Sequence, residues 1–110
     1  MSSEYPLPEG VEADFAVIVT DDSCEPYIRR GGAALIKSGL RARDGDVGFF
    51  FDGAEAVIRQ YCEDWAGNAY LFALNRARRG LDRMYPAAEA KPVCCFGLVQ
   101  GLGDVPLPER

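Results

Sequence analysis

Two glycine turns that separate short apolar segments place the strongest constraint on the fold. Asp52-Gly53 lies between residues 47–51 and residues 55–62, and Ala66-Gly67-Asn68 lies between that second segment and residues 69–74. Glycine readily takes the positive φ that a tight hairpin needs, and short runs of β-branched and aromatic residues favour strands. The two turns therefore predict a meander of three antiparallel strands.

Three further apolar segments have the length and composition of strands. They are residues 13–20, 33–37 and 93–99, which are short and rich in valine, isoleucine, leucine and phenylalanine. With the meander they bring the number of predicted strands to six.

Helical signals are confined to one short segment. Residues 22–28 start with an N-cap type of residue, with Glu25 three positions on and Pro26 still within the first turn, which predicts a short helix. Residues 75–90 are polar and arginine-rich and have no clean period, so no element is predicted there. The predicted fold class is mainly β, with small twisted β-sheets, hairpins and one short helix.

The length and composition fit one domain. The 110 residues are 48% hydrophobic, which is enough for one modest core. We predict a lead-in or linker at residues 1–12, a domain at residues 13–102 and a C-terminal tail at residues 103–110. No apolar run approaches the roughly 20 residues of a membrane span, and the first residues lack a signal-peptide pattern, so a soluble cytoplasmic protein is expected.

Charge and residue usage exclude several classes of function. A net charge of -5 makes the chain a poor binder of polyanions, so it should not bind DNA by itself. The chain contains no histidine, which excludes Ser-His and Cys-His catalysis. Its four cysteines form no C-x-x-C pair, and we expect them to be free thiols that serve as small core residues. Neither a metal site nor a cofactor is expected.

Residues 21–26, Asp-Asp-Ser-Cys-Glu-Pro, carry a resemblance to a known family. They resemble the nucleophile motif of the LexA, phage repressor and UmuD-type serine peptidases, which is roughly Gly-Asp-Ser-Met-x-Pro. Asp22, Ser23 and Pro26 match this pattern, whereas Asp21 stands for Gly and Cys24 for Met.

Two later segments extend the resemblance in the expected order. Residues 43–47, Arg-Asp-Gly-Asp-Val, are similar to the family's x-x-Gly-Asp-Val element. Residues 55–61 are similar to its Glu-Ala-x-Val-Lys-x-Tyr strand, which carries the catalytic lysine. The likeness covers about residues 13–100, and it implies a LexA-like C-terminal peptidase domain.

The resemblance implies a Ser-Lys dyad with Ser23 at the nucleophile position and with Asp22, Cys24 and Pro26 in the turn that would carry the oxyanion site. A lysine buried in apolar surroundings can lose its proton near neutral pH and so act as the base. The matching position here is Arg59. A guanidinium stays protonated and has no lone pair to accept the serine proton, so the dyad is broken.

Alternatives for the chemistry remain open at this stage. Lys37 and Lys91 are the only lysines, and either could be a relocated base, although neither lies on the strand that resembles the base-bearing one. Cys24 could be a thiol nucleophile, but the family's Met at that position packs inward, which favours a core role.

Structural roles are also open for the same residues. Ser23 could be only an N-cap, and Arg59 could form an ion pair with Asp22, Glu25 or Glu55. An arginine cluster invites a nucleic-acid interpretation, but acids such as Asp82 lie nearby and a solvated loop is favoured. Its members are Arg76, Arg78, Arg79 and Arg83.

The resemblance implies a function in transcription control. The expected role is the regulatory and dimerisation domain of a repressor, a homodimer with impaired peptidase activity, whose DNA contacts would come from an N-terminal helix-turn-helix domain not present in this chain. Family repressors cut themselves at a small dipeptide such as Ala-Gly, and the only such pair here is Ala66-Gly67. The alternatives are an active autoproteolytic peptidase that uses another base, and a non-catalytic β module that holds a peptide segment in the old groove. Type I signal peptidases share the Ser-Lys chemistry but need a membrane anchor.

Overall fold

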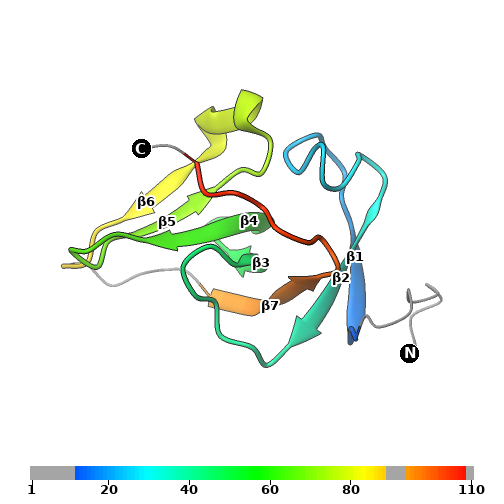
Figure 1. The fold of residues 1–110 in the computed structure, drawn as a ribbon, viewed down its shortest axis with the longest axis horizontal. Coiled ribbons are helices and arrows are strands. Elements are labelled where there is room, and N and C mark those ends of the chain that lie inside the picture. Colours follow the sequence, from blue (N-terminus) through cyan, green and yellow to red (C-terminus); the bar gives the residue numbers. More distant parts are fainter. Residues whose placement is uncertain (1–11, 89–93, 109–110) are drawn as a thin grey trace.

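The protein is one twisted antiparallel sheet of seven strands (Figure 1). A computed structural model describes residues 12–88 and 94–108. The strand order across the sheet is β1-β2-β7-β3-β4-β5-β6. The strands are β1 (Phe15–Ile18), β2 (Ala33–Ser38), β3 (Val47–Phe51), β4 (Ala56–Glu63), β5 (Ala69–Phe72), β6 (Arg83–Tyr85) and β7 (Cys94–Gln100). The mainly β class and the six predicted strands are confirmed.

The order follows from the two predicted hairpins and one long return. β3, β4 and β5 pair in sequence through the turns at Gly53 and Gly67, whose φ values of 104° and 87° only glycine takes readily. β7 then returns to the middle of the sheet and pairs with both β2 and β3. The sequence predicted several small sheets, and this central strand joins them into one instead.

Two short elements differ from the sequence prediction. The helix predicted at residues 22–28 is a series of turns, in which the N–H groups of Tyr27 and Ile28 both donate to the Cys24 carbonyl, at 3.0 Å each. The Asp21 carboxylate accepts the Ser23 N–H, a local bond of the kind that competes with a regular helix. The described helix is instead a 3₁₀ segment, η1 (Arg76–Leu81), which precedes β6 in the arginine-rich region left unassigned from sequence.

One buried cluster forms the centre of the domain. Val19, Cys24 and Ile28 from the segment after β1 pack against residues of β2, β3 and β4. Glycine allows the close approach of β7 to β2, because a Cβ on Gly97 would lie 2.6 Å from the Lys37 carbonyl oxygen. The cluster therefore joins the segment around residue 23 directly to the sheet.

The cysteines divide into two groups. Cys24 and Cys62 are buried, as expected of core thiols, but Cys94 is exposed and Cys95 is partly exposed. The prediction that all four fill the core is therefore wrong for these two, because β7 begins at the sheet's rim, where Cys94 pairs with the exposed Phe51.

The C-terminal segment does not simply leave the domain. Leu102 and Val105 pack against the buried cluster, and the Gln60 side chain donates to the carbonyls of Gly45 and Val105, at 3.1 and 2.8 Å. The predicted tail is thus attached to β4 at least as far as Val105. Within residues 12–88 and 94–108, no helix has the length and apolar character of a membrane span.

Candidate functional site

Ser23 lies in a tight turn that follows β1. Its side chain is buried, with the residue only 3% exposed. The Ser23 hydroxyl and N–H both donate to Oδ1 of Asp21, at 2.7 and 3.0 Å. These two hydrogen bonds, from the hydroxyl first, lower the pKa of Asp21 below its ordinary value, and the Arg59 charge adds to the effect.

Arg59 reaches the same serine from β4. Its Nη1 lies 3.3 Å from Oγ of Ser23 and donates to it, and also donates to the Ile58 carbonyl at 2.8 Å. The residue is 8% exposed. The structure therefore brings together the two residues that the sequence assigned to the dyad, although they are 36 positions apart.

The ion pairs predicted for Arg59 are not formed. In the part of the chain that the structure describes, no carboxylate lies within 4.0 Å of its guanidinium. Asp22 pairs with Arg78 instead, and Glu25 accepts a hydrogen bond from the Arg30 N–H at 3.4 Å. Arg59 is anchored by a hydroxyl and a carbonyl instead, those of Ser23 and Ile58.

Asp21 and Arg59 both form hydrogen bonds with the Ser23 hydroxyl, but neither activates it. Its proton points to Asp21 and its oxygen accepts from Arg59. The guanidinium has no lone pair, and a carboxylate whose pKa is lowered binds a proton weakly. Neither neighbour is a strong base.

The other candidate bases and nucleophiles lie in unsuitable places. Lys37 pairs with Glu12 at 3.5 Å and is not among the residues around Ser23. Lys91 lies outside the described residues. The Cys24 thiol is 3.9 Å from Ser23 Oγ, but burial raises its pKa, which disfavours the reactive thiolate.

A pocket of about 170 Å³ opens beside Ser23 and Arg59, and we call it the serine pocket. Its walls come from β1 and the turn after it, from the start of β4, and from Phe49 and Leu81. Polar lining residues are Thr20, Asp21, Ser23, Glu55 and Arg59. Ser23 and Arg59 therefore line one hollow together with apolar residues of the edge strand β1.

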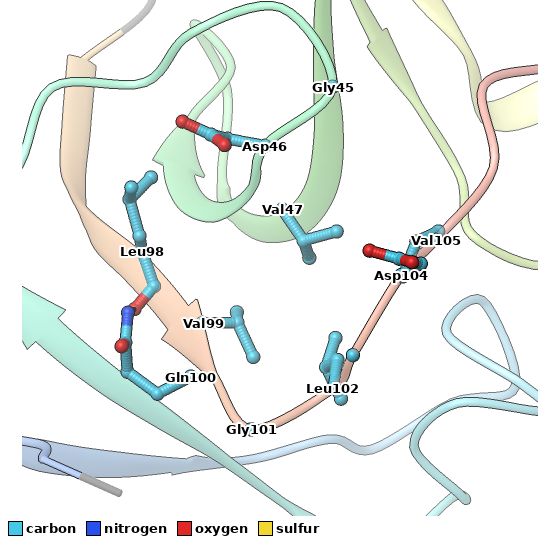
Figure 2. A pocket seen from close by; sticks show the side chains of 11 residues that line it. Gly45, Asp46, Val47, Leu98, Val99, Gln100, Gly101, Leu102, Asp104 and Val105 are labelled. Carbon is cyan, nitrogen blue, oxygen red and sulfur yellow. Dashed lines mark hydrogen bonds between the residues drawn. The ribbon is translucent and has the colours of Figure 1, made fainter.

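A larger cavity of about 490 Å³ lies elsewhere (Figure 2). It is bounded by Gly45–Val47, by the end of β7 and by the C-terminal segment, with the Asp46 and Asp104 side chains at its rim. None of the residues that the sequence assigned to the site lines it. Ser23, Cys24 and Arg59 line the smaller pocket.

Two residues that the sequence analysis left in a solvated loop hold the serine turn in place. Asn75 donates its N–H to the Ser23 carbonyl and its side-chain amide to the Asp22 carbonyl, at 2.8 and 2.9 Å. Nε of Arg78 donates to the Asp22 carboxylate at 2.7 Å. An asparagine at the start of a short helical turn was the available signal, since Asn75 is the N-cap of η1.

The remaining predicted residues flank this network. Asp22 is partly buried, Cys24 is buried beneath the turn and Pro26 is exposed beyond it. Two members of the arginine cluster pair with acids, Arg76 with Asp82 at 2.9 Å and Arg78 with Asp22 at 2.7 Å. Among the described residues, no three histidine, cysteine or acidic side chains are placed to hold a metal ion.

Comparison with known proteins finds one matching family model. A family model described as Peptidase S24-like matches residues 2–90, a span that holds both Ser23 and Arg59. No curated protein matches the chain.

Proposed function

The chain belongs to the Peptidase S24-like family, the family of LexA, UmuD and phage repressor C-terminal domains, and from this premise we propose that it is a regulatory and dimerisation domain whose peptidase site has lost its base. In this proposal the protein retains the LexA-like fold and the serine turn of the family but has lost the cleavage chemistry. Contact with DNA would come from a separate helix-turn-helix domain, because this chain carries a net charge of -5.

One observation carries the loss of activity. Nη1 of Arg59 donates a hydrogen bond to Ser23 Oγ at 3.3 Å, at the place where the family's mechanism needs a group that accepts the hydroxyl proton. A permanently protonated guanidinium can donate to this oxygen but cannot accept its proton. Arg59 thus makes the contact with Ser23 that the family's lysine would make, but it cannot act as the base.

The first test is self-cleavage. We expect the protein, incubated at alkaline pH and followed by mass spectrometry, to keep its intact mass, because no group beside Ser23 takes up the proton. Two fragments that are absent from a Ser23→Ala control would overturn the proposal in favour of an active peptidase with another base.

A gain-of-function variant tests the reason for the inactivity. Arg59→Lys places a side chain that can lose its proton in a site that is 8% exposed, so we expect partial cleavage activity that rises with pH. The matched control combines Arg59→Lys with Ser23→Ala and should be inactive. If Arg59→Lys folds and cuts nothing, the missing base does not account for the inactivity.

Dimerisation is the second part of the proposal. β7 lies inside the sheet and has no free edge, so a dimer contact near it would use the face and rim of the sheet, where Phe96 is 41% exposed. Sedimentation velocity at high micromolar concentration should give a dimer, and Phe96→Ser should shift the protein toward monomer. A monomer at that concentration would contradict this part.

The non-catalytic peptide-binding module remains a second candidate. The observation in its favour is that the serine pocket persists beside Arg59, with a volume of about 170 Å³.

A further inference from the structure

The serine pocket is lined by a buried guanidinium, that of Arg59, which makes no direct ion pair with a described carboxylate. Arg59 is 8% exposed, and no described carboxylate lies within 4.0 Å of its guanidinium. The nearest negative group in its network is Asp21, which it reaches only through the Ser23 hydroxyl. A buried cation without a direct counter-ion is costly, and an anion that enters beside it recovers part of that cost.

Two of the three guanidinium nitrogens of Arg59 make no described hydrogen bond within the protein. Nη1 makes both described hydrogen bonds, to Ser23 Oγ and to the Ile58 carbonyl. Among the described side chains, no fully buried nitrogen or oxygen lacks a partner. The Nη2 and Nε donors therefore keep access to solvent, and Arg59 lines the serine pocket. Two adjacent N–H donors in this arrangement match the two oxygens of a carboxylate.

The other charges in the pocket disfavour a doubly charged anion more strongly than a singly charged one. Asp21 and Glu55 also line it, so a doubly charged phosphate would meet two negative groups and only one positive group. A carboxylate carries one charge and fits the guanidinium fork. The volume of about 170 Å³ holds roughly five or six water molecules, which suits a chain end with a small side chain.

The remaining walls suit a peptide. β1 is the outermost strand of the described sheet, and its residues Val17 and Ile18 line the pocket. The Val19 N–H donates inward to the Gly32 carbonyl, and the alternation of antiparallel pairing turns the backbone groups of Ile18 toward the free edge. An extended chain can pair with that edge while its apolar side chains meet Val17, Phe49 and Val57.

From these features we infer that the serine pocket binds the C-terminal carboxylate of an extended peptide, with Arg59 as its main anchor. The peptide lies along β1, and its last residue is small. The inference rests on the proposed function in one respect, because a peptide that stays bound must not be cut by Ser23. The position that a base would occupy becomes a carboxylate-binding position.

Calorimetric titration of the whole chain with two matched peptides tests the inference. The probes are acetyl-Ala-Ala-Val-Ala with a free C-terminal carboxylate and the same peptide as its C-terminal amide. We expect the amide to bind at least about ten-fold more weakly, because it loses a charge-assisted pair of hydrogen bonds. Equal affinity of the two peptides, or no binding of either at millimolar concentration, would overturn the inference.

Competition with two small anions tests whether the pocket recognises a peptide or only a negative charge. Sodium acetate supplies the carboxylate without the chain and should compete only at far higher concentration than the peptide. Inorganic phosphate should compete no better than acetate. If acetate competes as well as the peptide, the extended chain is not recognised, and if phosphate binds more tightly than the peptide, the ligand is not a carboxylate.

A matched pair of variants assigns the effect to one residue. Arg59→Gln should abolish the preference for the free acid, whereas Arg43→Gln, at an exposed arginine outside the pocket, should leave it unchanged. Thermal unfolding of both variants shows whether they are folded. If Arg59→Gln does not fold, the inference is tested by comparing the free-acid peptide with the amide peptide on the unaltered protein. Mass analysis of the peptide after titration distinguishes failure of this inference from failure of the proposed function. A cut peptide contradicts the proposal that the site is inactive, and a peptide that does not bind contradicts the carboxylate pocket.

Discussion

The Ser23 hydroxyl is held between groups of opposite charge. It donates to Asp21 at 2.7 Å and accepts from Arg59 at 3.3 Å, so it links a carboxylate to a guanidinium that do not touch each other. Such a link is cooperative, because each hydrogen bond polarises the next. The serine has therefore acquired a structural role that does not depend on nucleophilic attack.

Thiol reactivity should differ between Cys24 and Cys94. Burial raises the pKa of the Cys24 thiol, and the residue is 1% exposed, whereas Cys94 is exposed at the start of β7. We expect iodoacetamide near neutral pH to modify Cys94 and to leave Cys24 unmodified, as measured by peptide mass spectrometry. Modification of Cys24 at a similar rate in the folded protein would show that the serine turn opens readily.

The proximity of Ser23 and Arg59 could be predicted from local motifs. Ser23 and Arg59 are identified by short patterns, and the structure places them in contact. The ion pairs expected for Arg59 are wrong, because charge pairing was judged from proximity in the motif and not from depth in the fold. Asn75 was missed because its bond to the Asp22 carbonyl joins positions 53 residues apart, which no local pattern encodes.

At the scale of elements, η1 fixes the serine turn. Its N-cap Asn75 binds the Ser23 and Asp22 carbonyls, and its residue Arg78 pairs with the Asp22 carboxylate. The coil between β5 and β6 in Figure 1 therefore connects one end of the meander to the segment after β1. Movement of η1 would move the serine.

Asn75→Ala tests this connection. The change removes the side-chain bond to the Asp22 carbonyl and the cap on the Ala77 N–H, so we expect the free energy of unfolding to fall by about 1–2 kcal/mol. Arg78→Gln, which removes an exposed ion pair to the same turn, should cost less. Urea denaturation measures both, and a larger loss for Arg78→Gln would mean that charge, not the amide clamp, holds the turn.

Gly97→Ala tests the packing of β7 on β2. A Cβ at this position would lie 2.6 Å from the Lys37 carbonyl oxygen and 2.7 Å from the Ile36 side chain, so the strands must separate. We expect a loss of about 2 kcal/mol or more in the free energy of unfolding. Gly80→Ala in η1, where nothing lies within 4 Å of the new atom, is the control and should be close to neutral. Equal stability of the two variants would contradict the close approach.

The element prediction succeeded where a turn residue and an apolar run coincide. The hairpins at Gly53 and Gly67 have the expected form, and β3 has the predicted bounds. β6 was missed because three residues are too few to show a period, and it forms only because β5 offers an edge. The helix predicted after Asp22 is replaced by turns because the Asp21 side chain takes the Ser23 N–H.

At the scale of the whole molecule, stability should depend on pH through acids that accept local hydrogen bonds. The Ser38 hydroxyl and N–H lower the pKa of Asp14, and the Ser23 hydroxyl and N–H lower that of Asp21. Hydrogen bonds from the side chains of Asn68 and Tyr70 lower the pKa of Asp64 to about 2. Each folded-state pKa lies below the ordinary value of 3.8.

The sign of the dependence follows from these shifts. Below about pH 4 the unfolded chain binds more protons than the folded chain, so stability is fully present above that pH and is lost as the pH falls toward about 2. Thermal unfolding followed at about pH 7, 4 and 2.5 should give a melting temperature that is lowest in the most acidic buffer. Asp64→Asn should reduce the fall in melting temperature between about pH 4 and 2.5. A melting temperature of the unaltered protein that does not change across this range would contradict the prediction.

The position of β7 bears on how the chain is made. A ribosome releases β1 and β2, and then β3 to β6, before it releases β7, yet β7 fills the gap between β2 and β3. Until that strand emerges, the nascent polypeptide consists of two partial sheets, each with an unpaired edge and an uncovered apolar face. Synthesis stalled before residue 94 would therefore leave a species prone to aggregation.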